Sequence, residues 1–271
     1  MRASHQAMKY AATALAICLI VGAAGLLMRA VSFFVPFFFS YTTREYTSHD
    51  VTDDIRVLEI NLKGVDLEVK RAADGVFRWE SNYRYLSVTE EGNRLLLLDR
   101  RNFHTKNRYG DALLRVHIPA GMVFDAVDIS SGAGRMLLDS IEAESLQLQL
   151  GAGKATLQNI RAAGRADIDA GVGDLLIRDS SFHNLDLDMG VGQLDFFGLL
   201  EGRTRLLLGV GSSRFDLVGS LSDYRLEIKQ GLGAFLVDGE PVGGDSELGE
   251  GDREVQIEAG LGSVRVDFSG E

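Results

Sequence analysis

Apolar and polar residues alternate in short runs through most of the chain beyond residue 54. This period of two is typical of strands with one buried face, because successive side chains of a strand point to opposite sides. Glycine, proline and short polar clusters separate the runs, as expected for turns. No run beyond Tyr41 has a helical period, so the body of the protein is expected to be all-β. The first strands are predicted at Ile55–Leu62, Val65–Lys70, Val76–Ser81, Arg94–Asp99, Leu113–Ile118 and Val123–Ile129.

A Gly-x-Gly motif recurs seven times in the second half of the chain, in steps of 19, 20, 19, 19, 22 and 29 residues. Self-similarity at a nearly fixed period is the signature of a solenoid. Apolar residues recur one, four and six positions after the first glycine, and an alternating apolar run precedes it. The structural repeat consists of Gly132, Gly134, Gly151, Gly153, Gly171, Gly173, Gly190, Gly192, Gly209, Gly211, Gly231, Gly233, Gly260 and Gly262.

The alternation slips by one residue at each motif. In the fourth repeat Leu187, Met189 and Val191 share one face, whereas the next apolar residues are Leu194 and Phe196. Such a slip indicates a bend, and the second glycine supplies the backbone freedom that a bend needs. We therefore expect a corner at the second glycine and a buried middle residue. The first glycines should form a column without side chains on the outside.

Rungs of about 20 residues that stack at the ~4.8 Å interstrand spacing predict an all-β parallel β-helix or β-solenoid, with two or three short strands in each coil. Stacking would place Val172, Val191 and Val210 in one column. The segment from residue 254 to 268 is expected to be the last rung and to cap the stack. The acidic, glycine-rich insertion before it, residues 239–253, is expected to be a surface loop. A second column is expected from Ile177, Phe196 and Phe215.

The first 41 residues are strongly apolar. Tyr10–Met28 carries no charge and as a helix would span roughly 28 Å, enough to cross a bilayer once. Arg2 and Lys9 precede it, which favours a cytoplasmic N-terminus and an extracytoplasmic body. Ala30–Tyr41 is too short to span and, with its phenylalanines, is expected at the outer membrane interface. A cleaved signal peptide is the alternative to an anchor.

These patterns divide the chain into three parts. Residues 1–41 are the predicted single-pass anchor with its aromatic segment, and the polar residues 42–54 are predicted to be a linker. Residues 55–271 are the predicted ectodomain, with N-terminal rungs or a cap over 55–130 and the Gly-x-Gly repeats over 131–271.

The net charge and the cysteine content limit the kinds of partner and site that the body of the protein can have. The chain has 39 acidic and 28 basic residues, a net charge of −11. An acidic body lacks the basic patch that usually marks nucleic-acid binding, so no nucleic-acid partner is expected. The one cysteine, Cys18, lies in the apolar N-terminal run, which leaves the body without disulfides or cysteine metal sites.

No catalytic motif stands out. Pairs of carboxylates can carry out acid–base chemistry, and β-helices include glycosidases and polysaccharide lyases. The alternation of apolar and polar residues places the candidate carboxylates on the outward, solvated face of the strands, where their charges also discourage edge aggregation. A carbohydrate-active enzyme therefore remains only the alternative, and no catalytic residue is assigned. The carboxylates in question are Asp167, Asp169, Asp186, Asp188, Asp195 and Asp216.

Metal and cofactor sites are not expected either. Acidic residues follow the Gly-x-Gly motif at Asp174 and Asp195 without recurring in register, unlike a calcium-binding roll. The segment from Gly151 to Lys154 lacks the other residues of a phosphate-binding loop. The histidines lack ligand spacing and are expected in structural or exposed positions. They include His49, His104, His117 and His183.

Aromatic residues cluster in the N-terminal β region. Such a cluster can close the end of a solenoid as a hydrophobic cap, or it can form a strip that binds sugars. The residues are Trp79, Tyr83, Tyr85, Phe103 and Tyr109.

The order IPAGMVFDAVDISSGAG, LQLQLGAGKATLQNI and LDLDMGVGQLDFFG resembles the bacterial "putative adhesin" β-strand-repeat family, a domain of unknown function on membrane-anchored surface proteins. The likeness covers roughly residues 55 to 268. It implies a right-handed β-helix outside the membrane and no catalytic residues. The expected function is a non-enzymatic surface-interaction or envelope-associated module that contacts a surface glycan or protein. A regulator of a neighbouring membrane or sensor protein is a further alternative.

Overall fold

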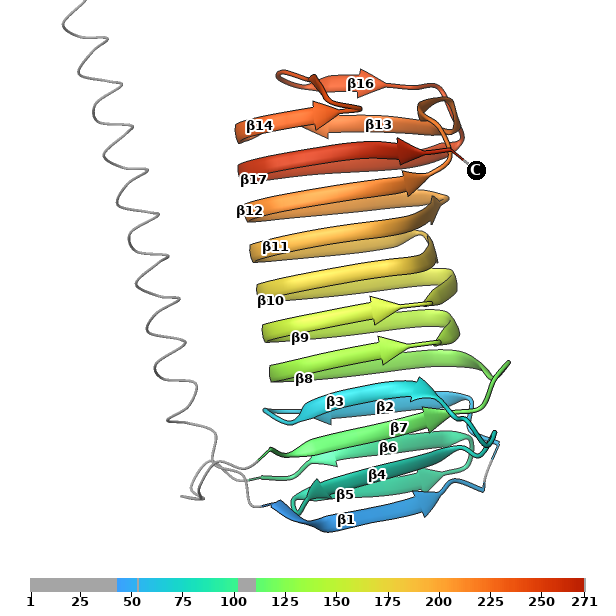
Figure 1. Ribbon diagram of the computed structural model, residues 1–271. Helices are drawn as coiled ribbons and strands as arrows, with labels where there is room; N and C mark the ends of the chain where they lie inside the picture. Colours follow the sequence, from blue (N-terminus) through green and yellow to red (C-terminus); the bar gives the residue numbers. More distant parts are fainter. Residues whose placement is uncertain (1–42, 53, 102–110, 271) are drawn as a thin grey trace, which may run out of the picture. The chain divides into compact units, whose positions relative to one another are not determined.

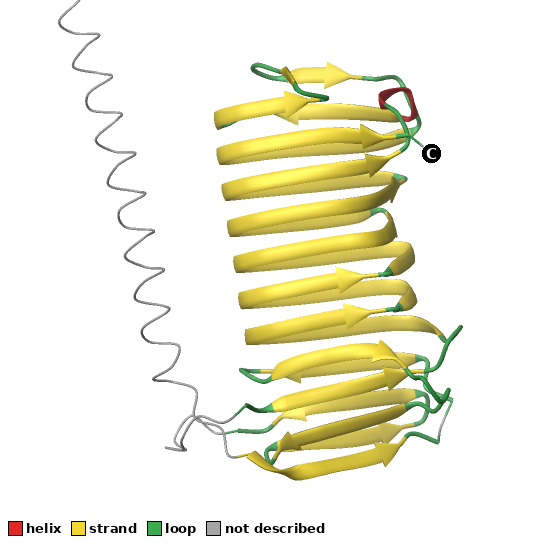
Figure 2. Ribbon diagram, viewed as in Figure 1, coloured by secondary structure: helices red, strands yellow, loops and turns green. Residues whose placement is uncertain are grey.

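The computed structural model describes residues 43–52, 54–101 and 111–270. These residues belong to one compact unit, which consists almost entirely of β-strands (Figure 2). The predicted anchor Tyr10–Met28 and the aromatic segment Ala30–Tyr41 lie outside the described residues. Within the described ranges, no helix has both the length and the apolar character needed to span a bilayer.

Five long strands form the central stack (Figure 1). Each pairs in parallel with the next, so the glycines of successive repeats lie side by side. Val172 pairs with Val191 and Val191 with Val210, while Ile177 pairs with Phe196. The predicted parallel solenoid is therefore confirmed. Its strands are β8 (Val123–Asp139), β9 (Glu142–Gln158), β10 (Arg161–His183), β11 (Leu185–Glu201) and β12 (Arg203–Val218).

Each central rung is one bent strand, so the expectation of two or three short strands per coil is wrong. Pairing between β11 and β12 continues through the motif, from Met189 to Val191, Gly192 and Gln193. The ladder survives the corner because glycine adopts the backbone angles that the bend requires. A rung thus has a first arm before the Gly-x-Gly motif and a second arm after it.

The hydrophobic core lies between the two arms. The predicted inward positions, four and six residues after the first glycine, are buried in almost every rung; Leu194 and Phe196 are each 1% exposed. Phe196 lies between Phe182 and Phe215, with ring centroids 6.1 and 6.0 Å apart. Full burial of one such side chain contributes ~1.5–3 kcal/mol. The stack therefore buries what no single rung could bury alone.

Chain order and spatial order differ at the C-terminal end. Strand β17 (Arg253–Ser269) pairs in parallel with β12 on one side, and with β13 (Tyr224–Lys229) and β14 (Leu232–Val237) on the other. The last Gly-x-Gly segment is thus an inner rung, and the expectation that it caps the stack is wrong. The insertion between β14 and β17 gives the chain the length to step back over one rung.

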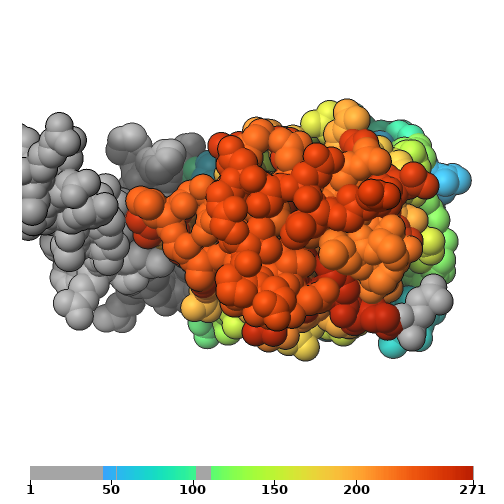
Figure 3. Space-filling model, turned by 90° about the horizontal axis from the view of Figure 1, so that it is seen from above, coloured from blue at the N-terminus to red at the C-terminus, as the bar shows by residue number. Residues whose placement is uncertain are grey.

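That insertion forms the cap in place of a plain surface loop. Strands β15 (Glu240–Pro241) and β16 (Ser246–Leu248) pair antiparallel with β14 and β13. The 3-10 turn η1 (Leu221–Asp223) precedes β13. Seen from above, residues of this C-terminal region cover the end of the stack (Figure 3). Covering strands of this kind keep a sheet edge from adding foreign strands.

At the N-terminal end, too, the order of the strands in space differs from their order in the chain. Strands β2 (Val57–Leu62) and β3 (Asp66–Arg71) pair with β8 on one side, and with β6 (Arg94–Asp99) and β7 (Leu113–Ile118) on the other. Strands β4 (Arg78–Tyr83) and β5 (Leu86–Glu91) then pair antiparallel with β7 and β6. The end rung is again covered by antiparallel strands.

Strand β1 (Thr43–Asp50) lies in the segment predicted as a linker, yet it pairs antiparallel with β4. Its residues lack an alternating apolar pattern because β1 lies at an edge, where pairing rather than burial holds it. His49 stacks on Trp79 at a centroid distance of 5.2 Å.

Two of the clustered aromatic residues are buried in this end of the unit. Trp79 is 7% exposed and Tyr83 is fully buried, and the Tyr83 hydroxyl donates a 2.9 Å hydrogen bond to Asp99. Burial favours the hydrophobic cap over a sugar-binding strip for these two residues. Phe103 and Tyr109 lie outside the described residues.

Candidate functional site

The second glycines of the repeat have backbone angles that L residues rarely adopt. Their φ angles range from +127° at Gly134 to +148° at Gly211. A Cβ added to Gly192 would lie 1.8 Å from the carbonyl oxygen of Gly173 in the preceding rung. Strain and collision both exclude a side chain there. The predicted corner is confirmed.

The first glycines lack side chains for a related steric reason. A Cβ on Gly190 would lie 2.4 Å from the carbonyl oxygen of Gly171, and one on Gly209 would lie 2.2 Å from that of Gly190. The predicted bare column exists, but contact between rungs accounts for it without any ligand.

The middle residues of the motif are not core residues, contrary to the prediction. Of the seven, Ala133 is buried, whereas Val172, Val191 and their equivalents are half-buried and Leu232 is 60% exposed. The bend places this residue at the rim of the coil, where it is covered mainly by the rungs on either side. The motif therefore shapes the corner without filling the interior.

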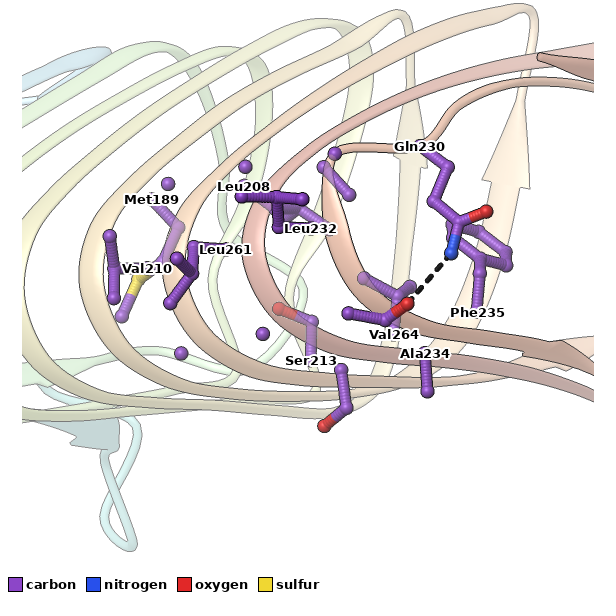
Figure 4. Close-up of a pocket in the computed structure, with 18 of the residues that line it drawn as sticks. Met189, Leu208, Val210, Ser213, Gln230, Leu232, Ala234, Phe235, Leu261 and Val264 are labelled. Atoms are coloured by element: carbon purple, nitrogen blue, oxygen red, sulfur yellow. Dashed lines mark hydrogen bonds between the residues drawn. The ribbon is translucent and has the colours of Figure 1, made fainter. Parts of the chain in front are cut away.

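A crevice runs along this glycine edge between β12, β17 and β14 (Figure 4). Met189, Leu208 and Phe235 line it together with the glycines. Its volume is about 20 Å³, roughly the space of one water molecule. The glycine edge thus offers no pocket for a small molecule.

The carboxylates considered for catalysis lie on two opposite faces. Asp167 pairs in register with Asp186, and Asp169 with Asp188, on the first arms. Asp195 lies with Asp216 on the second arms, across the core from the other four. The carboxylates of the first arms therefore cannot act on one bond together with those of the second arms.

The histidines do not converge either. His117 Nε2 lies 3.1 Å from Glu80 Oε1, a close contact without hydrogen-bond geometry. His183 is half-buried at the end of β10, and His104 lies outside the described residues. In the part of the chain that the structure describes, no three His, Cys, Asp or Glu side chains are grouped so that they could hold a metal ion.

A long hollow lies at the edge opposite the glycine corners, where loops join successive rungs. It has a volume of about 700 Å³ and adjoins a second hollow of about 400 Å³; Phe197 lines both. We call the two together the loop-edge groove. The groove extends from Arg71, at the end of β3, to Val218, at the end of β12. Five rung steps separate these strands, about 24 Å at ~4.8 Å per step.

A bulge in β10 shapes the middle of the groove. Ile177 pairs with Phe196 and Ser180 with Gly198, so Arg178 and Asp179 together lie opposite Phe197 alone. An extra residue of this kind bends a strand and redirects its side chains. Asp179 accordingly has a φ angle of +49°. Phe197 is 39% exposed, whereas Phe196 beside it is buried.

The groove also gathers charged side chains that make no ion pair or side-chain hydrogen bond with a described residue. Among the described side chains, the arginines that make no ion pair, side-chain hydrogen bond or ring contact are Arg71, Arg100, Arg161 and Arg178. All but Arg100 line the groove. Glu142 and Asp179 in the groove also lack such contacts. Within the groove Arg214 is paired with Asp216 at 3.2 Å, and outside it most described arginines make such contacts, as Arg203 does with Glu254 at 2.9 Å.

The sequence patterns did not single out Phe197 or these arginines. A signal was present, because Phe196-Phe197 places an aromatic residue at an outward position of a regular strand. The polar run Arg178–Ser181 also interrupts the alternation. Without the register between β10 and β11, neither feature indicates a common site.

Three solved structures of low sequence identity are similar to this chain. One from Clostridium sporogenes, described as a "putative cell adhesion protein", is 12% identical with a TM-score of 0.34, and the match covers 83% of this chain and 99% of that one. A "putative adhesin" from Bacteroides fragilis is 9% identical, with a TM-score of 0.37 and coverages of 84% and 99%. A "putative lipid binding protein" from Parabacteroides distasonis is 12% identical, with a TM-score of 0.38 and coverages of 83% and 96%. A search of curated proteins returns no match.

The family comparison is more decisive. The family model described as Toastrack DUF4097 matches residues 55–268, which are the rungs and both end caps without β1. The resemblance of the repeat to a bacterial family of unknown function is therefore supported by a family model that matches most of the chain. The chain belongs to the Toastrack DUF4097 family.

Proposed function

We propose that this protein is a non-enzymatic surface-interaction module of the cell envelope, adhesin-like in role. The solenoid would lie outside the membrane, held by the single N-terminal helix predicted over Tyr10–Met28. The loop-edge groove would be its binding surface. The right-handed sense of the coil, which the family resemblance implies, is part of the proposal.

The observation that carries the proposal is the loop-edge groove. The groove combines the exposed ring of Phe197 with three arginines, Arg71, Arg161 and Arg178, that make no ion pair with a described residue. Aromatic residues and arginine are enriched in protein binding surfaces. Because the groove crosses several rungs, its shape suits an extended ligand better than a compact one.

An enzyme on this scaffold is the alternative with less support. Asp195 and Asp216 line the groove, but Asp216 forms an ion pair with Arg214. A catalytic carboxylate must be within hydrogen-bond reach of the reacting group, and the ion pair with Arg214 already engages Asp216.

Retention on envelope material tests the proposed function. We expect the full-length chain, solubilised in mild detergent, to bind isolated cell-envelope polymers and to release no reducing sugar from them. A variant with Phe197→Ala and Arg161→Gln should lose retention. The matched control combines Leu137→Ala and Arg165→Gln, two exposed positions outside the groove. Equal retention of both variants, or no retention of the parent, would refute the proposal.

The membrane arrangement has its own test. Protease added to spheroplasts, in which only the cytoplasmic membrane is intact, should digest a C-terminal tag on the full-length chain, and carbonate washing should leave the chain in the membrane fraction. A protected tag would contradict an extracytoplasmic body. Release by carbonate would contradict the anchor.

A further inference from the structure

We propose that the loop-edge groove binds a neutral, linear glycan, with Phe197 as the platform on which one sugar ring stacks. This inference rests on the proposed function and adds the chemical class of the ligand.

Phe197 is the exposed aromatic side chain that lines the groove. It occupies an outward position of β11, 39% exposed, and its ladder neighbour in β12 is Asp216, which offers no apolar surface for packing. On the other side lies the bulge of Arg178 and Asp179, which opens the hollow next to the ring. An aromatic ring with one face exposed beside polar groups suits the C–H face of a pyranose, which is apolar while its rim is polar.

The unpaired charges favour a ligand with hydroxyl groups. A hydroxyl both donates and accepts hydrogen bonds, a guanidinium only donates, and a carboxylate only accepts. Arg71, Arg161 and Arg178 supply donors, whereas Glu142 and Asp179 supply acceptors. A neutral glycan can use both kinds of group.

The same mixture disfavours charged polymers. A polyanion would bring its charges close to Glu142, Asp179 and Asp195, and a polycation would do the same with the three arginines. Like charges placed together without compensation weaken binding. Neutrality of the ligand follows from this balance.

The shape of the groove favours a linear chain. Each rung advances by ~4.8 Å along the stack, close to the length of one sugar ring in an extended chain. The groove crosses from β3 to β12, so several consecutive rings can each lie against one rung. Charged side chains line the groove from Arg71 of β3 to Asp179 of β10, and the aromatic ring of Phe197 follows on β11, one rung from the β12 end.

Calorimetric titration of the full-length chain in detergent tests the inference. The probes are hexasaccharides of β-1,4-linked glucose, β-1,3-linked glucose and β-1,4-linked N-acetylglucosamine, with hexagalacturonate as the acidic comparator and an extended neutral peptide as the non-sugar comparator. We expect at least one neutral hexasaccharide to bind, and both comparators to bind more weakly. Failure of every neutral hexasaccharide, or tighter binding of either comparator, would overturn the inference.

Variants locate the site. Phe197→Ala should weaken binding of the neutral hexasaccharide about five- to tenfold, whereas Leu137→Ala, a hydrophobic residue of similar exposure on another rung, should not. Arg161→Gln should also weaken binding, while Arg165→Gln should leave it unchanged. Thermal melting confirms that each variant is folded. Unchanged affinity in folded Phe197→Ala would refute the platform.

The outcomes separate this inference from the proposed function. A chain that is retained on envelope polymers through the groove but prefers an acidic or peptide ligand keeps its function and loses the glycan assignment. A chain that is retained on no envelope material loses both.

Discussion

Glycine at each corner acts through its neighbour in the stack. At Gly192 the positive φ angle and the carbonyl oxygen of Gly173 both exclude a Cβ, and each rung repeats this relation with the rung before it. A substitution therefore disturbs two rungs at once. Glycine is required here for two reasons, which are the close contact with a residue 19 positions earlier in the chain and the local bend.

Gly192→Ala should lower the free energy of unfolding by about 3 kcal/mol or more, from backbone strain and from displacement of the adjoining rung. Gly243→Ala is the control, because nothing lies within 4 Å of its Cβ direction and its φ is not positive. Denaturant unfolding followed by circular dichroism measures both. If the two variants were equally stable, the steric account of the glycine columns would be wrong.

The buried hydroxyl of Thr204 lowers the stability of the fold by a small amount. It is 1% exposed, its hydroxyl has no hydrogen-bond partner, and it pairs with Val255 of β17. Thr204→Val removes the unsatisfied hydroxyl at almost constant volume and should stabilise the protein by about 1 kcal/mol. In a chain of this size the melting temperature should rise by about 2–4 °C. Thr156→Val, at a half-exposed position, should leave it unchanged, and a lower melting temperature for Thr204→Val would contradict the account.

The alternation of single residues predicted much of the fold. Strands β6 and β7 begin and end where the sequence pattern places them, and Leu194 and Phe196 point inward as the phase slip requires. The handedness of the coil stays a prediction. The middle residues of the Gly-x-Gly motif were wrongly predicted to be core residues. A period of two shows which side chains share a face of the strand, but it does not show whether the core behind that face extends as far as the corner.

Pairing partners were less predictable than the strands themselves. Parallel neighbours follow from the period as long as chain order and spatial order agree, as they do from β8 to β12. Nothing in the sequence of β17 distinguishes an inner rung from a terminal one, because its inward residues Val255, Ile257, Val264 and Val266 are apolar, like those of most other rungs. The groove was missed for the same reason, since it depends on the register between β10 and β11.

The inner position of β17 makes the C-terminal end depend on the last residues of the chain. In a chain that ends after Asp252, β13 and β14 lose their parallel partner. Hydrogen exchange should then show rapid exchange throughout Tyr224–Val237, while Glu142–Glu201 stays protected. Protection of β13 and β14 in the shortened chain would mean that they can dock directly on β12, against this prediction.

At the scale of the whole molecule, exposed carboxylates contribute to stability through a few specific contacts. The Ser220 N–H and hydroxyl lower the pKa of Asp223, and the Arg203 guanidinium lowers the pKa of Glu254. Both groups lie at the C-terminal end, where η1 meets β17 and its neighbours. Asp223 accepts hydrogen bonds from Ser220 at the start of η1, whereas Glu254 of β17 pairs with Arg203 of β12 and with Arg225 of β13.

The sign of their pH dependence follows from the lowered pKa values. Such a group stabilises the fold above its unfolded pKa, near 3.8 for Asp223 and 4.5 for Glu254, and this contribution is lost as pH falls through the folded pKa. We expect the melting temperature to fall more steeply below about pH 4.5 in the parent than in the Asp223→Asn, Glu254→Gln double variant. Parallel melting curves from pH 7 to 3 would contradict this assignment.

At both ends of the solenoid the order of the strands in space differs from their order in the chain. This difference limits where rungs can be added or removed. A tandem duplication of one rung between β9 and β11 would add a coil that meets the same glycine columns on both sides and would leave each end as it is. A rung appended after Ser269 would find no open edge, because β17 is already paired on both sides. Insertions and deletions of whole rungs are therefore expected in the middle of the gene, and the groove would lengthen or shorten with them.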